Sequence, residues 1–555
     1  MAYVPRTSPD QDDTGWPPGV RYIIGNEGCE RFSYYGMRAI LTVFLAQYLY
    51  LNHPVYSQDP ERIAKAHYHV FAGAVYLFPL LGAVIADRLI GKYRAILGLS
   101  IVYCAGHGVL ALSEHSVTGF WIGLGLIAVG SGGIKPNVSA HVGDQFGRSN
   151  WFRVPSIFQA FYFIINLGSA AATLLIPKTL QWYGPGVAFG IPGILMALAT
   201  LAFWMGRKVF VHVPAHPGGK LGALDALSSG AFVVAFAHLF APAVFHELSW
   251  KVLVPSALGF IVFGGVVFAI RQRIEQDDGF LAVLFYAVRS YLSGAKASPA
   301  EPGVAPAVIH ADPKVQARRE RVLGSRLFGP AARHFGVEAA EGPPAVLNIV
   351  SVFFLVSVFW ALFDQHGSSW VLQAKTMNLH LPGIGDVQPS QIAALNPVMV
   401  MLLIPLNNRL IYPGIGKLGF EMTPLRRMTG GMLVAGASFL LVAFIQHRIE
   451  AAGVGQVSFL WQVLPYLVIT QAEVMVSITG LEFAYTQAPK RMKSTVMGFW
   501  LAAVAGGNLM VALFETFSTL PLATGFQVYA GLMFGAGVLF GIRAYFYRSR
   551  DYVQD

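Results

Sequence analysis

The feature that most constrains this chain is a series of long apolar stretches. A helix needs about 20 mostly apolar residues to cross the hydrocarbon core of a bilayer, and such stretches recur along the whole sequence. They are too long for the strands of a membrane barrel, which alternate polar and apolar residues over about 10 positions. We therefore predict fourteen transmembrane helices. Their approximate bounds are 22–51, 68–88, 93–113, 118–140, 154–178, 185–206, 224–245, 252–271, 346–373, 391–411, 426–447, 458–487, 491–516 and 522–547.

The composition argues against a soluble protein. Of 555 residues, 55% are apolar and only 12% are charged, whereas about a quarter of the residues of an average soluble domain are charged. So few charges could not cover a water-exposed surface of this size. The two cysteines, Cys29 and Cys104, support neither a disulfide framework nor a zinc site.

The distribution of basic residues predicts the orientation of the helices. With the N-terminus in the cytoplasm, 29 of the 39 Lys and Arg residues fall on the cytoplasmic side and six on the opposite side. This asymmetry follows the positive-inside rule. It explains the net charge of +10 without a nucleic-acid partner. Both termini are expected in the cytoplasm, and the lipid bilayer is the expected environment.

The predicted helices divide into two groups of six. We expect an N-terminal bundle over residues 1–210, an inserted helix pair and cytoplasmic connector over 211–345, and a C-terminal bundle over 346–555. The segment from Gly82 to Lys92 resembles the loop signature of the major facilitator superfamily, whose halves are structural repeats. A weaker counterpart runs from Asn408 to Lys417. The predicted fold class is an all-α polytopic membrane protein with the major facilitator fold plus a two-helix insertion.

Seven charged residues fall inside the predicted spans. One charged side chain at the bilayer centre costs about 2.5–3.5 kcal/mol, so together they would exceed the roughly 5–15 kcal/mol net stability of a typical fold. They must therefore face one another or a wet cavity. Four acids against three bases leave one negative charge, which a single bound proton would cancel. The seven residues are Glu27, Glu30, Arg31, Arg38, Lys135, Asp364 and Glu473.

Helical spacing places several of these charges in polar stripes. Glu27, Arg31 and Arg38 share one face of the first predicted helix with Tyr34, because they recur at helical intervals. Such stripes are typical of helices that line an aqueous cavity. Similar stripes contain Phe158, Tyr162, Asn166 and Ser169; Trp360 and Asp364; Glu473 and Ser477; and His69 and Tyr76.

Each of these residue types also has a structural explanation. Aromatic residues in membrane helices often serve packing or the interface belt, and a lone histidine is often a hydrogen-bonded structural group. An Asn-Pro pair can be a helix kink, and a cluster of opposite charges can be a static ion pair. These alternatives apply to Tyr34, Trp360 and Trp500, to His69, to Asn396-Pro397, and to Glu27, Glu30 and Arg31.

Motifs for other energy sources and for catalysis are absent. The sequence contains no G-x-x-x-x-G-K-[ST] phosphate loop and no H-E-x-x-H or G-x-S-x-G element. Gly123 and Gly125 are not followed by the third glycine of a dinucleotide fingerprint, and no predicted strand precedes them. We therefore expect no cofactor, no metal site and no enzymatic activity. A carrier without a nucleotide site must use an ion gradient or run downhill. Carboxylates beside arginines suit protons, because moving the cation changes the proton affinity of the acid.

Sequence blocks in both halves resemble the proton-dependent oligopeptide transporter (POT) family. The block Glu27-Gly-Cys-Glu-Arg-Phe-Ser-Tyr-Tyr-Gly36 fits the family motif E-x-x-E-R-F-x-Y-Y-G. The resemblance extends over roughly 20–210 and 346–545, but not over the connector, and the extra helix pair is similar to the insertion of bacterial members. The further blocks are Gly130–Ser139, Gly143–Phe146, Phe161–Ser169, Phe359–Ser368 and Gly480–Phe483.

The resemblance implies a proton-coupled symporter that imports di- and tripeptides by alternating access. By this analogy Arg31 and Lys135 would hold the peptide carboxylate, and Glu473, with Asn166 and Asn396, would hold the amino terminus. Clamping the invariant ends of the peptide leaves adaptable pockets for many side chains. The implied substrate-binding residues are Arg31, Tyr35, Arg38, Tyr76, Lys135, Tyr162, Asn166, Trp360, Asn396, Glu473, Ser477 and Trp500, with His69 as a further candidate.

The same resemblance implies a coupling scheme. Glu27, Glu30, Arg31 and Asp364 would couple proton binding to transport. Arg38 and Asp364 would pair across the bundles as an outer gate, and Lys135 and Glu473 would form an inner pair in the opposite state. Two departures stand out: the acid at 364 is Asp where many relatives carry Glu, and His366 replaces a frequent Gln.

Two other functions remain open at this point. A carrier of nitrate or another small anion could use the same scaffold, although Glu473 has no amine to bind in that case. A non-transporting nutrient receptor or a membrane enzyme is a third possibility, which the absent catalytic motifs disfavour. For the symporter we expect a monomer in the bacterial cytoplasmic (inner) membrane.

Overall fold

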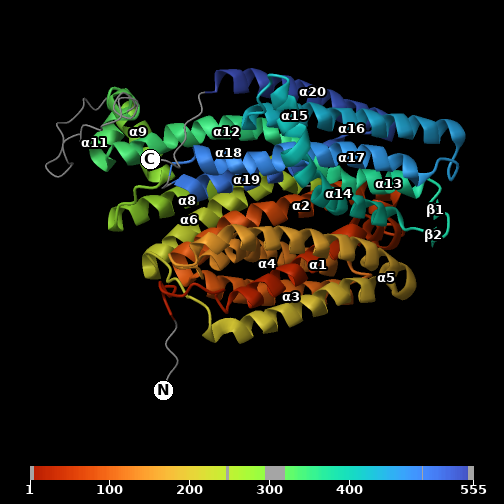
Figure 1. Ribbon diagram of the computed structural model, residues 1–555, viewed down its shortest axis with the longest axis horizontal. Helices are drawn as coiled ribbons and strands as arrows, with labels where there is room; N and C mark the ends of the chain where they lie inside the picture. Colours follow the sequence, from red (N-terminus) through yellow and green to blue (C-terminus); the bar gives the residue numbers. More distant parts are fainter. Residues whose placement is uncertain (1–5, 246–248, 294–318, 490–491, 548–555) are drawn as a thin grey trace.

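The computed structural model describes residues 6–245, 249–293, 319–489 and 492–547, and it consists almost wholly of long helices packed side by side (Figure 1). The N-terminal half ends with an unusually long helix, α5, which Gly184 interrupts with a positive φ of 81°. The predicted spans 154–178 and 185–206 meet at this kink. The helices of this half are α1 (Val20–Phe44), α2 (Pro60–Val84), α3 (Lys92–Leu112), α4 (Val117–Gly143) and α5 (Val154–Met205).

The C-terminal half contains a second set of long helices. A small antiparallel hairpin of β1 (His380–Leu381) and β2 (Gly385–Asp386) lies between α13 and α14. A π-helical turn joins α17 to α18, so that these two form one continuous segment. The helices are α12 (Val337–Phe363), α13 (Ser369–Lys375), α14 (Leu395–Leu406), α15 (Tyr412–Lys417), α16 (Pro424–Ala452), α17 (Val463–Glu473), α18 (Thr479–Gln487), α19 (Lys493–Phe517) and α20 (Leu522–Phe546).

The insertion lies between these halves in the sequence. Its described helices are α6 (Gly219–Ala237), α7 (Ala241–Val244), α8 (Trp250–Ile274), α9 (Phe280–Leu292) and α11 (Gly329–Phe335). Sequence analysis did not predict α9. Residues 294–318 of the predicted connector lie outside the described residues.

Twelve helical segments of the described chain are long and apolar enough to cross a membrane. The count differs from the fourteen predicted spans for two reasons. Polar and charged residues lower the hydropathy of α1, which is therefore not among the twelve, and α5 is counted once although Gly184 divides it. The number fourteen stays a prediction, whereas the all-helical membrane architecture is confirmed.

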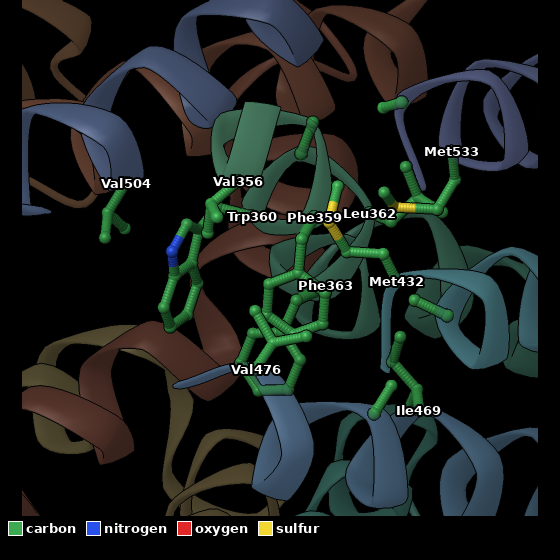
Figure 2. Packing of buried hydrophobic residues seen from close by; sticks show 14 of the residues in the cluster. Val356, Phe359, Trp360, Leu362, Phe363, Met432, Ile469, Val476, Val504 and Met533 are labelled. Atoms are coloured by element: carbon green, nitrogen blue, oxygen red, sulfur yellow. The ribbon is translucent and has the colours of Figure 1, made fainter. Parts of the chain in front are cut away.

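Each half has its own hydrophobic core. The N-terminal core includes Tyr34, Phe44 and Phe120. The C-terminal core surrounds α12, and Figure 2 shows part of it, including Phe359, Phe363 and Met432. Separate cores allow two bundles to move relative to each other without exposing either core.

Glycines permit very close helix crossings within each half. A Cβ atom added to Gly82 on α2 would lie 2.4 Å from the Gly132 carbonyl oxygen on α4. Likewise, a Cβ atom on Gly507 of α19 would lie 2.4 Å from the Ser357 carbonyl oxygen on α12. Backbone atoms cannot move aside as a flexible side chain can, so both crossings require glycine.

The two signature segments adopt the same local structure. Residues Ile85–Ile90 form a π-helical turn at the end of α2, and Asn407–Ile411 form one at the end of α14. The wider turn occurs at matching places of the two halves although the second signature is weak in sequence. This correspondence supports the structural repeat that the segments predict.

A chain of ion pairs links the inserted helices to each other and to the N-terminal bundle. Arg271 on α8 contacts Asp225 on α6 at 2.8 Å, and Asp225 also contacts Arg88, in the π-helical turn after α2, at 3.4 Å. A second acid, Asp277, lies 3.6 Å from Arg88. The signature turn of the first half is therefore the docking point of the insertion.

The crossing of α2 and α4 gives a first prediction. Gly82→Ala forces a methyl group against the α4 backbone, and overpacking of this kind costs about 1–3 kcal/mol. We expect a lower midpoint of thermal unfolding in detergent, measured by intrinsic tryptophan fluorescence. Gly98→Ala is the matched control, because nothing lies within 4 Å of its Cβ position on α3. Equal midpoints for the two variants would contradict the close contact.

Candidate functional site

The charged face of α1 forms a compact ion-pair cluster. Arg31 Nε lies 2.7 Å from Glu27 Oε1 and 3.0 Å from Glu30 Oε2. All three side chains are buried, and Glu30 is fully enclosed. Spacing by three and four residues aligns them on the helix, and their mutual attraction offsets part of the cost of removing them from water. Two acids around one base leave this cluster one negative charge.

A second ion pair joins the two bundles. Arg38 Nη2 on α1 contacts Asp364 Oδ1, directly after α12, at 2.5 Å. The predicted contact between these residues is thus present. Asn508 Nδ2 on α19 donates to the other Asp364 oxygen at 2.7 Å, and Arg38 Nε donates to the Tyr68 hydroxyl at 2.5 Å. Asp364 is 1% exposed, so its charge is balanced wholly by protein groups.

His69 extends this network on α2. Its Nδ1 lies 2.8 Å from Asn508 Oδ1, and its Nε2 lies 2.8 Å from the Ser368 hydroxyl. Because the Asn508 amide nitrogen already donates to Asp364, its oxygen must accept, which assigns the proton to Nδ1 of His69. Ser368 then donates to Nε2. His69 therefore reaches Asp364 through Asn508, and no hydrogen bond joins His69 directly to Asp364 in the described part of the chain.

Lys135 on α4 lies between two tyrosine rings. Its Nζ is 4.0 Å from the ring centre of Tyr34 and 4.6 Å from that of Tyr76. Both distances are typical of cation–π contacts. Glu30, Arg31, Arg38 and Asp364 all interact electrostatically with Lys135. Within the described chain, no carboxylate lies at ion-pair distance from Lys135.

The C-terminal bundle contributes an acid, Glu473, at the end of α17. Asn396 Nδ2 on α14 donates to Glu473 Oε2 at 2.7 Å and to the Thr470 hydroxyl at 3.1 Å. Glu473 interacts electrostatically with Arg38 and Asp364, yet no basic group of the described residues is at ion-pair distance from it. Ser477 follows within the π-helical turn Val474–Ile478. Such turns are frequent at functional sites because they reorient side chains.

Aromatic residues border this charged region. Trp360 and Trp500 pack at 6.1 Å between ring centres and at 85°, and Figure 2 shows Trp360 on the side of α12 that faces Val504. The buried Trp360 Nε1 finds no acceptor among the described residues. On α5, Asn166 donates to the Tyr162 carbonyl at 2.8 Å, and the Tyr162 side chain is 38% exposed.

The structure brings most predicted residues into one connected region. The charges of Glu30, Arg31, Arg38, Lys135 and Asp364 act on one another, and Tyr35 interacts with Arg31, Arg38 and Glu473. Lys135 and Glu473 are not in contact; their pairing was predicted for the opposite conformational state and stays a prediction. No cluster of metal-type ligands occurs within the described residues.

Sequence analysis missed two members of the network. Tyr68 and Asn508 complete the hydrogen bonds of Arg38 and Asp364. Asn508 could have been found, because an amide inside an apolar helix is costly unless it has a partner. Tyr68 carried no such signal, since tyrosine is common in helices of this kind.

The bundles are also joined at the end of the molecule near the start of α2. Lys65 contacts Glu515 of α19 at 2.7 Å, and Lys375 contacts Glu61 at 2.8 Å. Arg62 donates to the Ser518 carbonyl, just after α19, at 3.3 Å. This end is the one that the distribution of basic residues predicts to be extracellular. The two bundles are closed against each other there.

Comparison with known proteins identifies relatives of the whole helical region. The model of the POT family, PTR2, matches residues 93–276 and 306–529. Solute carrier family 15 member 2 of Homo sapiens is 30% identical over 491 residues, covering 86% of this chain and 55% of the relative. Solute carrier family 15 member 1 of Mus musculus is 30% identical over 462 residues, covering 79% and 53%. The chain thus spans about half the length of these curated relatives.

Solved structures match over nearly the full length. A crystal structure of an auto-inhibited POT family peptide transporter is 37% identical with a TM-score of 0.76, covering 97% of this chain and 99% of that one. The crystal structure of the POT family transporter PepTSo is 38% identical with a TM-score of 0.75, covering 96% and 98%. The fold, the two-bundle charge network and the family match agree: the chain is a transmembrane protein that belongs to the POT family.

Proposed function

We propose that this protein is a proton-coupled symporter that imports di- and tripeptides by alternating access. The observation that carries the proposal is a pair of opposite charges, one in each bundle, that lack an ion-pair partner among the described residues. Lys135 lies on α4 of the N-terminal bundle, and Glu473 lies on α17 of the C-terminal bundle. A zwitterionic peptide supplies one opposite charge to each. The family also supports a transporter rather than an enzyme.

The proposed peptide site clamps both ends of the substrate. Arg31 and Lys135 would receive the carboxylate, and Glu473 with Asn396 would receive the amino group. Asn396 already donates to Glu473, which orients the carboxylate in advance and reduces the entropy lost on binding. Trp360 and Trp500 would border the side-chain pockets, Tyr35, Tyr76, Tyr162 and Ser477 would contact the peptide, and Asn166 would help to hold its amino terminus.

Proton coupling would act through the contact between the bundles. Protonation of Asp364 removes the charge that holds Arg38, and the Arg38–Asp364 pair crosses from one bundle to the other. Breaking it would free the closed end to open. Glu27 and Glu30 around Arg31 would link proton occupancy to carboxylate binding, because a substrate carboxylate competes with both acids for Arg31.

In the proposed cycle, this structure is the conformation in which the extracellular end is closed. The contacts of Lys65 and Lys375 across the bundles support that assignment. We further propose that the protein acts as a monomer in the bacterial cytoplasmic membrane, with both termini in the cytoplasm and no cofactor. The energy would come from the proton gradient alone.

The first test of this function is Asp364→Asn. The amide keeps an oxygen for Arg38 but cannot cycle a proton. In liposomes with an inward proton gradient, uptake of a labelled dipeptide should fall about tenfold or more, an effect of at least about 1.4 kcal/mol. Counterflow exchange without a gradient should persist. Asp386→Asn, on the exposed β2, is the control, and gradient-driven uptake by Asp364→Asn at the wild-type rate would refute the coupling role.

The second test addresses the amino-terminal pocket with Glu473→Gln. A hydrogen bond to a charged group contributes about 1.5–3 kcal/mol, so the dissociation constant of a dipeptide should rise about 10- to 100-fold. An N-acetylated dipeptide should bind both proteins weakly and alike. Calorimetric titration measures these constants, and Glu450→Gln on α16 is the matched control.

The anion alternative makes the opposite prediction in the same liposomes. A nitrate carrier would accumulate nitrate and show no dipeptide uptake, and Glu473→Gln would leave its transport intact or improved. The Glu473 carboxylate, which has no basic group at ion-pair distance among the described residues, disfavours an anionic substrate, because like charges repel in a medium of low dielectric constant.

A further inference from the structure

Helix α9 carries an exposed apolar stripe that no part of the proposed transport site uses. Its exposed residues Leu281, Phe285, Val288 and Leu292 recur at intervals of four, three and four positions, so they share one narrow face. The opposite face is buried through Phe280, Val283 and Ala287. Arg289 and Tyr291 flank the stripe on either side. An apolar stripe with polar flanks is typical of helices that lie in a membrane interface.

Two ring contacts give the depth of α9 along the bundle. Phe285 lies 5.6 Å from Phe268 of α8, and Phe268 is six residues inside the end of that helix at Ile274. At 1.5 Å per residue this is roughly 9 Å. Phe280 lies 5.8 Å from Phe499, which is six residues inside the start of α19 at Lys493. Both contacts place α9 level with the last turns of α8 and the first turns of α19, rather than beyond the ends of these membrane-spanning helices.

The neighbouring surface is lipid-facing in character. The end of α8 exposes Val266, Ile270 and Ile274. Among the twelve apolar spans of the described chain, α8 is the most exposed, because only 17% of its apolar stretch is buried in the protein. The stripe of α9 continues this apolar surface. The helix has 13 residues, about 20 Å in length, which is too short to cross the bilayer.

We propose that α9 is an interfacial helix whose stripe of Leu281, Phe285, Val288 and Leu292 inserts between the headgroups and acyl chains of the bilayer. Its buried face packs on α12 and α11, its first residue Phe280 contacts α19, and Phe285 near its middle contacts α8, at the end of the molecule where α12 begins (Figure 1). The helix therefore connects the insertion to the C-terminal bundle through its protein contacts, and its exposed stripe contacts the lipid. The inference rests on the membrane architecture and not on the transported substrate.

Spin labelling tests this placement directly. In a Cys29→Ser, Cys104→Ser background, single cysteines replace Phe285 and Leu292 and receive nitroxide labels, and the protein is reconstituted in phosphatidylethanolamine–phosphatidylglycerol vesicles. Electron paramagnetic resonance then compares collision with oxygen, which concentrates in lipid, and with a water-soluble nickel chelate. Val262→Cys on the exposed face of α8 is the lipid reference, and Glu275→Cys in the loop before α9 is the water reference.

The expected oxygen-to-nickel ratio at positions 285 and 292 is several-fold above that at Glu275→Cys and approaches that at Val262→Cys. Ser290→Cys, on the opposite face of α9, should give a low accessibility to both reagents. A ratio at 285 and 292 equal to the water reference would overturn the proposal. Low accessibility to both reagents at the stripe would also overturn it, because another protein segment would then cover this face.

Discussion

The cost of placing charge in a medium of low dielectric constant governs this structure. Every charged group inside the described spans must find compensation, and the protein provides it in two ways. Arg38 and Asp364 are paired and fully hydrogen-bonded by Tyr68 and Asn508. Lys135 is held instead by two tyrosine rings and Glu473 by the Asn396 amide, without a counter-charge at ion-pair distance among the described residues. The first arrangement stabilises a conformation, whereas the second leaves charge for a ligand.

The presence of a separate hydrophobic core in each bundle also explains the use of polar contacts between the bundles. Each bundle has its own hydrophobic core, so apolar packing holds the halves together internally. Polar and ionic contacts connect one half to the other, together with two small apolar clusters that join α2 to α19. A polar contact can be exchanged for water or for a substrate group at a smaller net cost than the opening of an apolar core, since hydrogen bonds to water replace those that are lost. Motion between rigid halves is therefore compatible with stable folding of each.

The sequence predicted the helical class, the two halves and the charged faces, because apolar run length and helical periodicity depend on local residues alone. The resemblance to the POT family also implied that Arg38 and Asp364 would meet, and the structure contains this contact. The sequence could not predict Tyr68 and Asn508 as their partners, because periodicity assigns a face to a residue and not the neighbour opposite it. The helix α9 was missed for a related reason: 13 apolar-rich residues fall below the length that signals a span. The boundary between the predicted spans 154–178 and 185–206 agrees with the break at Gly184, because a glycine between apolar runs usually ends a helix.

The contacts that close one end of the bundles differ in their exposure to water. Lys65 and Glu515 are 12% and 9% exposed, whereas Lys375 and Glu61 are 40% and 47% exposed. Dissolved ions screen exposed charges over a Debye length of about 8 Å at physiological concentration but reach enclosed pairs poorly. The enclosed Lys65–Glu515 pair therefore keeps its strength at low and at high salt concentration. Salt outside the cell should accordingly weaken the Lys375–Glu61 contact more than the Lys65–Glu515 contact.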